Sequence, residues 1–142
     1  MIDLVVVGGG HAGLAAAADA AERGLRVVVC EKTDRLGGSA ALSAGILWTA
    51  PDMATLREVV PDGDPELGRV LVEGFEPAVE RVRAAGIAVS ERWYGQMGFG
   101  VAYRTDVHAL HEHWRRVIVE HGGELRMNAP VRSLRFADGR VA

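Results

Sequence analysis

The stretch MIDLVVVGGGHAGLAAAADA, residues 1–20, decides the fold. Its largely apolar, β-branched run Ile2–Val7 predicts a strand that is buried on both faces in a parallel sheet. Consecutive glycines then predict a turn, and the alanine-rich segment after them predicts a helix, Leu14–Arg23, that ends at Gly24. A second buried strand follows at Leu25–Cys30. The order strand, turn, helix, strand predicts a βαβ unit within an α/β, Rossmann-like domain that has a parallel sheet.

The glycines of this turn follow the spacing G-x-G-x-x-G at Gly8, Gly10 and Gly13, after a strand and at the start of a helix. Gly8 permits the tight turn, Gly10 lets a pyrophosphate approach the backbone, and Gly13 lets the helix pack closely on the strand. The helix N-terminus adds free N–H groups and a partial positive charge. Glu31, which ends the second strand, can accept hydrogen bonds from a ribose 2′-hydroxyl. The pattern predicts a dinucleotide site. The alternative is that the glycines serve packing alone, and the spacing does not distinguish NAD from FAD.

The segment that follows, EKTDRLGGSAALSAGILW, carries a more specific signal. With the opening VVVGGGHAGLAAA, its EK pair, GGS turn and SAGILW run resemble the N-terminal part of the flavoproteins that include fumarate reductase, succinate dehydrogenase and 3-ketosteroid Δ1-dehydrogenase. The resemblance is strongest over residues 1–50 and is traceable through the DPEL helix and the final HGGELRMNAPVRSLRFADGRV. It implies a partial, Rossmann-like FAD-binding domain that is incomplete at its C-terminus. Residues 1–50 then form the βαβ unit and flavin loop, 51–104 a helical and loop excursion, and 105–142 a helix and strands that return to the domain.

The same resemblance implies a set of FAD-binding residues. They are Gly8, Gly10, His11, Ala12, Gly13, Glu31, Lys32, Gly37, Gly38, Ser39, Ala40, Ala44, Gly45, Ile46 and Val131. In chain order they are expected along the pyrophosphate, the adenosine ribose, the ribityl phosphate and the flavin ring near N5, with the last at the adenine. The small side chains around the second glycine pair let the backbone pass close to a flat, bulky ring. Ile46 departs from the fumarate-type members, which often carry a second glycine there, and histidine is one of many residues tolerated at position 11.

The function that the resemblance implies is the FAD-binding portion of a flavin-dependent oxidoreductase. Such an enzyme moves a hydride between flavin N5 and a carbon next to a carbonyl-activated C–C bond of a small-molecule substrate. Its catalytic residues lie mostly in other segments, so none is identified here. One alternative is a catalytically silent FAD- or nucleotide-binding module. Another is an NAD-dependent dehydrogenase, against which the GGS and SAGI segments argue.

Composition and charge exclude several other classes of function. The net charge is −3 and no basic block is present, which argues against a nucleic-acid partner. No stretch approaches the ~20 apolar residues that a membrane span needs. Cys30 is the sole cysteine and reads as an inert, buried side chain in a reducing compartment, so the chain is expected to be cytoplasmic.

The middle of the chain is predicted to form a long connection followed by a helix. Residues 33–64 are rich in turn formers and predict a long connection. Asp64 and Pro65 then begin a helix that Gly86 ends, and Gly74 and Pro77 are expected to kink or split it. Its apolar positions are Leu67, Val70, Leu71, Phe75, Val79 and Val82. A short strand is predicted at 87–89, and the aromatic segment 93–103 as loop or ligand wall. Its aromatic side chains could equally line a cavity or form part of a core. They are Trp93, Tyr94, Phe99 and Tyr103.

The last part of the chain predicts a helix and strands. Thr105 is expected to cap a helix through His121 with an apolar stripe of Val107, Leu110, Trp114, Val117 and Ile118. His108 and His111 lie three residues apart on it, but without a third ligand a solvated helix face is favoured over a metal site. Asp138 and Gly139 predict a hairpin turn. The returning strand is short, which predicts an unpaired sheet edge and association with a second copy or a partner chain.

Overall fold

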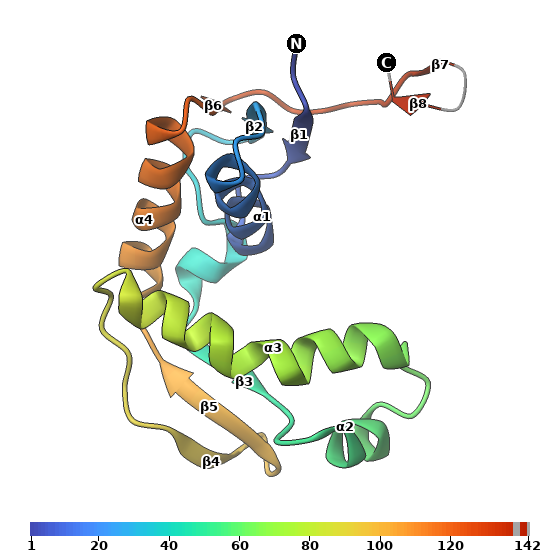
Figure 1. Ribbon diagram of the computed structural model, residues 1–142, viewed down its shortest axis with the longest axis vertical. Helices are drawn as coiled ribbons and strands as arrows, with labels where there is room; N and C mark the ends of the chain where they lie inside the picture. The colour runs from blue at the N-terminus through green and yellow to red at the C-terminus, as the bar shows by residue number, and fades with distance from the viewer. Residues whose placement is uncertain (138–139, 142) are drawn as a thin grey trace. The chain divides into compact units, whose positions relative to one another are not determined.

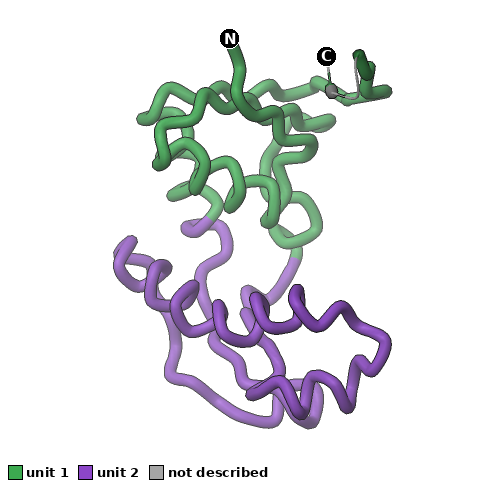
Figure 2. The backbone as a smooth tube through the Cα atoms, turned by 45° about the vertical axis from the view of Figure 1, so that its right-hand side comes forward, with its two compact units in different colours: residues 1–42, 111–142 green, residues 43–110 purple. Residues whose placement is uncertain are grey.

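The structure, a computed structural model, describes residues 1–137 and 140–141. The chain forms two compact units (Figure 2). Unit 1 comprises residues 1–42 and 111–142, and unit 2 comprises residues 43–110. The helix α4, Val107–Glu120, runs from unit 2 into unit 1. Unit 1 is therefore built from both ends of the chain.

Unit 1 contains the predicted parallel sheet. Its strands are β1 (Leu4–Val7), β2 (Val27–Cys30) and β6 (Glu124–Arg126), in the order β1-β2-β6 (Figure 1). Both pairings are parallel. The helix α1, His11–Glu22, connects β1 to β2 and packs against both strands. The α/β Rossmann-like fold with a parallel sheet is thus confirmed.

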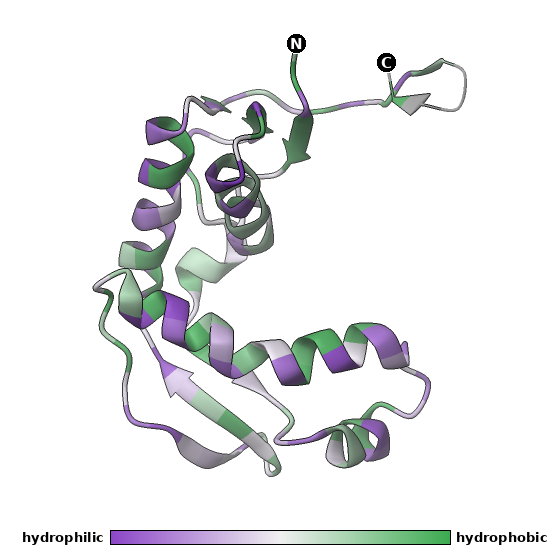
Figure 3. Ribbon diagram, viewed as in Figure 1, coloured by the Kyte–Doolittle hydropathy of each residue, from purple (hydrophilic) through white to green (hydrophobic). Residues whose placement is uncertain are grey.

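The core of unit 1 forms where α1 meets the sheet and α4. Its buried members are Leu14, Ala17, Ala18, Ala20, Ala21, Val27, Val29, Val117 and Ile118. The alanines explain the close packing, because their small side chains let the helix backbone approach the strands. Burial on both faces was wrong for β1: Val5 is 54% exposed and Val7 60% exposed. In the part of the chain that the structure describes, β1 is an edge strand, and Leu4 and Val6 are the β1 side chains that pack against this core. Figure 3 shows the hydrophobic colour of β1 and of much of α1.

Unit 2 contains an antiparallel sheet that the sequence did not reveal. Its strands are β3 (Ile46–Thr49), β4 (Trp93–Gln96) and β5 (Gly100–Arg104), in the order β3-β5-β4. The reading of residues 93–103 as loop was wrong. They form a hairpin, because Met97 and Gly98 adopt positive φ angles at the turn while the flanking aromatic and β-branched residues suit strands.

The predicted connection 33–64 also contains regular structure. A 3₁₀ helix, η1, spans Gly38–Leu42, the strand β3 follows it, and the helix α2 spans Met53–Val59. Asp52 caps α2 by accepting a hydrogen bond from the Thr55 N–H. These elements are short, so their periodicity is too brief to be visible in the sequence.

The long helix α3, Pro65–Ala84, begins where the sequence predicted. Asp64 caps it by accepting hydrogen bonds from the N–H groups of Glu66 and Leu67. The helix continues through Gly74 and Pro77 without a break, so of the kink or split expected there, the split was wrong. Of its apolar positions, the last three pack toward the core of unit 2 and the first three are exposed. The buried ones are Phe75, Val79 and Val82, and the exposed ones are Leu67, Val70 and Leu71.

The start of α4 differs from the prediction by one residue. Asp106, not Thr105, is the capping side chain, and its Oδ1 accepts hydrogen bonds from the N–H groups of His108 and Ala109. The Thr105 hydroxyl instead donates to the Ala88 carbonyl at 2.9 Å, and its backbone bridges to Val89. This bridge is all that forms of the strand predicted at 87–89. The predicted apolar stripe of α4 is confirmed.

The C-terminal strands β7 (Phe136–Ala137) and β8 (Arg140–Val141) pair antiparallel, as a hairpin requires. The predicted turn at Asp138 and Gly139 lies outside the described residues. Over residues 1–137 and 140–141, no helix has the length and apolar character that crossing a membrane would take.

Candidate functional site

The glycine turn between β1 and α1 meets the steric requirements of its sequence pattern. Gly8 has a φ of +100°, a conformation that side chains disfavour. A Cβ on Gly13 would lie 2.0 Å from the Gly8 carbonyl oxygen, so the helix can approach the strand only with glycine there. A Cβ on Gly10, in contrast, would meet nothing within 4 Å. The turn therefore leaves open space beside Gly10 while it is tightly packed at Gly13.

The N-terminus of α1 faces no capping side chain in the described structure. Gly10 is the N-cap residue, and the helix ladder begins with the hydrogen bond from the Leu14 N–H to the Gly10 carbonyl at 2.9 Å. The N–H groups of the first turn are therefore without partners in the helix itself. Such groups, with the helix dipole behind them, are suited to bind an anion.

Glu31, the residue that follows β2, holds this turn through hydrogen bonds to its carboxylate. Its side chain is only 7% exposed. Its Oε2 accepts a hydrogen bond from the Gly9 N–H at 2.7 Å, and its Oε1 accepts hydrogen bonds from the N–H and hydroxyl of Thr33 at 2.8 and 2.9 Å. The hydrogen bond from Gly9, and after it those from Thr33, hold the pKa of Glu31 below its usual value. Sequence reasoning missed this role, because Glu31 was read only as a ribose ligand.

The second glycine pair lies against the first turn. The Gly37 N–H donates to the Gly9 carbonyl at 2.8 Å, and Gly37 bridges Gly10 in parallel register. Gly37 and Gly38 both have positive φ angles, and a Cβ on Gly38 would lie 3.4 Å from the Gly10 Cα. The structure thus brings the two glycine segments and Glu31 together within unit 1. We call residues 8–13, Glu31 and residues 37–38 the glycine cradle.

The other predicted site residues lie outside the glycine cradle. Ser39 and Ala40 follow the cradle in η1, and Lys32 and Val131 are exposed residues of unit 1. Ala44, Gly45 and Ile46 belong to unit 2. There Gly45 has a φ of +70°, and its carbonyl accepts a hydrogen bond from the Thr105 N–H at 2.8 Å.

A pair of histidines lies behind the cradle. His11 Nδ1 is 3.1 Å from His111 Nε2, and the His11 ring also packs edge-on against Trp114. Burial lowers the pKa of His11. His111 is only 6% exposed, so its assignment to a solvated helix face was wrong. It lies three residues before Trp114 on the apolar stripe of α4, which is the signal that would have placed it inside.

Metal ligands are not grouped around these histidines. His108 is exposed, and no cluster of three or more metal-ligating side chains occurs within the described ranges.

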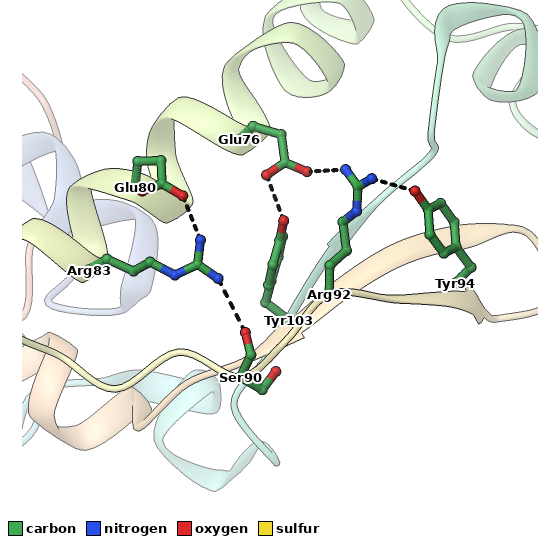
Figure 4. Close-up of polar contacts among 7 residues, drawn as sticks. All are labelled: Glu76, Glu80, Arg83, Ser90, Arg92, Tyr94 and Tyr103. Atoms are coloured by element: carbon green, nitrogen blue, oxygen red, sulfur yellow. Dashed lines mark hydrogen bonds and ion pairs between the residues drawn. The ribbon is translucent and has the colours of Figure 1, made fainter.

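The aromatic residues of the hairpin divide between core and surface. Tyr103 is buried and Tyr94 is exposed. The Tyr103 hydroxyl donates to Glu76 at 2.7 Å, and Arg92 bridges Glu76 and the Tyr94 hydroxyl (Figure 4). Burial, and then the hydrogen bond to Glu76, raise the pKa of Tyr103. These contacts join α3 to the hairpin, and we assign the network a structural role. Trp93 and Phe99 are half-buried.

A comparison with family models finds one match. The model described as "FAD binding domain" matches residues 3–120. The match includes the glycine cradle and all of unit 2.

Curated relatives match with moderate identity over short lengths. The 3-oxosteroid 1-dehydrogenase of Mycobacterium tuberculosis is 46% identical over 73 residues, which are 51% of this chain and 13% of that protein. The urocanate reductase of Eggerthella lenta is 35% identical over 113 residues, which are 66% of this chain and 19% of that protein. The chain thus spans less than a fifth of the length of either relative.

Solved structures share the fold over nearly the whole chain. The 3-ketosteroid Δ4-(5α)-dehydrogenase of Rhodococcus jostii RHA1, solved in complex with 4-androstene-3,17-dione, has a TM-score of 0.81 at 21% identity. The similarity covers 98% of this chain and 40% of that one. A flavocytochrome c3 fumarate reductase has a TM-score of 0.73 at 21% identity, covering 94% of this chain and 28% of that one.

Proposed function

Because the chain belongs to the FAD binding domain family, we propose that it binds FAD through the glycine cradle of unit 1. The observation that carries the proposal is the open space beside Gly10, next to the uncapped N-terminus of α1. A diphosphate fits this arrangement, because the absent Cβ leaves room for it and the helix N–H groups can donate to its oxygens.

The match to the FAD binding domain model supports FAD over NAD as the cofactor, and the second glycine pair is compatible with it. Gly37 and Gly38 lie against Gly9 and Gly10 and keep the chain free of side chains where it leaves the turn. A dinucleotide that extends beyond the diphosphate can continue along such a backbone. In the proposal Glu31 and Lys32 lie at the adenosine ribose, Val131 at the adenine, and residues 44–46 beside the flavin ring.

The reaction that we propose for the whole protein is hydride transfer to or from a carbon of a carbonyl-activated C–C bond. The flavin ring, when bound, supplies the hydride chemistry. The names of the relatives, a steroid dehydrogenase and a urocanate reductase, support this class of reaction. The alternative is a catalytically silent module that binds FAD or another nucleotide. It would bind the cofactor in the same cradle and show no turnover.

The substitution Gly10→Val tests the cofactor site. Two methyl groups on a new Cβ would enter the open space, so we expect bound FAD to be lost while the circular dichroism spectrum is retained. The matched control is Gly74→Val, since a Cβ on Gly74 also meets nothing within 4 Å but the residue lies on α3 in unit 2. Flavin absorbance after purification with added FAD is the measurement. Equal FAD content in Gly10→Val and Gly74→Val would refute the proposal.

A further inference from the structure

The helix α3 uses one side for its contacts within unit 2. Phe75 and Val79 on this side pack against the antiparallel sheet, beside β5 (Figure 1). Gly68 lies against α2, since a Cβ on it would come within 2.9 Å of Leu56 Cδ2. These contacts bury one side of the helix and leave the neighbouring side to solvent.

A row of apolar and small residues lies on this neighbouring side of α3. Leu67 is 69% exposed and Leu71 is 50% exposed, and Gly74 and Ala78 are exposed as well. They are four, three and four residues apart, which is the spacing that keeps one side of a helix against a partner helix. Val70, which is 72% exposed, flanks the row. We call Leu67, Leu71, Gly74 and Ala78 the α3 seam.

The α3 seam is self-complementary in the sizes of its side chains. Two copies of α3 that pair antiparallel, about a two-fold axis between positions 71 and 74, oppose Leu71 of each copy with Gly74 of the other. The adjacent layers oppose Leu67 with Ala78. The space beside Gly74 is open, because a Cβ there would meet nothing within 4 Å, so each leucine has room to enter. A parallel pair would oppose Gly74 with itself and leave a hollow, so size favours the antiparallel arrangement.

The charges of α3 are self-complementary in the same arrangement. Asp64 and Glu66 lie at the start of the helix, whereas Arg81 and Arg83 lie in its last turn. Extended by one layer, the antiparallel pairing brings Arg81 of each copy to Asp64 of the other, and the two helix dipoles run in opposite directions. In a parallel pair the acidic ends would meet each other, and so would the basic ends. The partner that fits both the sizes and the charges is the same helix in reverse.

We propose that the α3 seam binds the α3 seam of a second copy of this chain, antiparallel, in a two-fold symmetric dimer. Burial of Leu67 and Leu71 drives the association, and the patterns of size and charge set its orientation. A single helix pair buries less than the ~1,200–2,000 Å² of stable interfaces, so we expect a reversible dimer with a dissociation constant on the order of 10–100 µM. The inference uses unit 2 alone and does not depend on FAD binding.

Sedimentation equilibrium of the 142-residue chain measures the association. Between about 5 and 500 µM, the average mass should rise from that of one chain toward that of two. Leu71→Ala removes the side chain that enters the hollow, and Gly74→Leu fills the hollow. Because the two-fold axis repeats each change, either variant should raise the dissociation constant about tenfold.

The double variant and a control test the register of the pairing. Leu71→Ala combined with Gly74→Leu again opposes a large side chain with a small one, so it should recover most of the wild-type affinity. The matched control is Val119→Ala on α4, because Val119 is 49% exposed, nearly as much as Leu71, and lies outside the seam. It should leave the dissociation constant unchanged. Circular dichroism of each variant checks that the helix content is retained.

Several results would overturn the inference. One is the mass of a single chain over the whole range of concentration. Another is a dimer that neither single variant weakens, which would place the association at another surface, such as a strand edge. Tighter association of Gly74→Leu would indicate a parallel pair, and a double variant as weak as the single ones would refute the register. FAD content is read from absorbance and the dimer from mass, so this inference and the proposed function fail independently.

Discussion

Replacement of the Glu31 carboxylate by an amide should loosen the glycine cradle before any cofactor is added. In Glu31→Gln one oxygen becomes an NH₂ group, which donates hydrogen bonds and cannot accept them. The two sides of the carboxylate face the N–H donors of Gly9 and Thr33, at 2.7 and 2.8 Å. Whichever way the amide turns, one backbone N–H meets another donor.

The magnitude follows from this mismatch. A donor left unsatisfied in a buried place costs about 1–3 kcal/mol. Glu31 is nearly fully buried, so water will not replace the lost acceptor easily. We therefore expect the free energy of unfolding at neutral pH to fall by about 1–3 kcal/mol. Glu58→Gln makes the same chemical change on the exposed surface of α2, and should change it by less than about 0.5 kcal/mol.

The pH dependence gives the second half of the assay. Because hydrogen bonds lower the pKa of Glu31 in the folded state, the carboxylate stabilises the fold above its unfolded pKa, and this stability is lost as pH falls through the folded pKa. The free energies of unfolding of the wild type and of Glu31→Gln, measured in urea, should therefore converge at acid pH. A constant difference at every pH, or no difference at neutral pH, would refute the assignment of Glu31 as the group that holds the turn.

Two further predictions concern the same part of unit 1. Gly13→Ala should lower the free energy of unfolding by about 1–3 kcal/mol, because its Cβ would collide with the Gly8 carbonyl. The control Gly10→Ala should leave the free energy of unfolding nearly unchanged, because its Cβ meets nothing within 4 Å. If thermal unfolding found Gly10→Ala the less stable of the two, the packing described here would be contradicted. Burial lowers the pKa of His11, so the folded state binds fewer protons than the unfolded one and stability is lost as pH falls below the unfolded pKa of about 6.5. His11→Gln should therefore reduce the fall in the free energy of unfolding between about pH 7 and pH 5. If urea unfolding gives the same dependence on pH for the variant and the wild type, the protonation of His11 is not linked to unfolding.

The parallel sheet could be predicted because its information is local. The strand β1, the glycine turn, α1 and β2 follow one another within the first 30 residues, and each has its own pattern of apolar and small side chains. The sheet of unit 2 could not be predicted in this way. Its strand β3 pairs with β5 across more than fifty residues, and both strands are too short to show a clear alternation.

The contacts around the site show the same limit. Gly8, Gly10 and Gly13 have the geometry that their spacing predicts, because steric demands act between near neighbours. The contact of His11 with His111 joins residues a hundred positions apart. Only the place of His111 on the apolar stripe of α4 hinted that it points inward, and nothing in the sequence named its partner.

The hydrogen bond between Gly37 and Gly9 has a consequence for how quickly and how tightly a ligand can be held. Glycine-rich segments have the most conformational freedom to lose when they become ordered. Here the Gly37 N–H is hydrogen-bonded to the Gly9 carbonyl, and the Gly9 N–H is hydrogen-bonded to the Glu31 carboxylate. Gly37 is also packed so closely that a Cβ on it would touch the ring of His111. The ordering of both segments accompanies folding, so a ligand that arrives later encounters a rigid surface. Its association should be limited by diffusion and orientation, with little entropy left for the protein to lose.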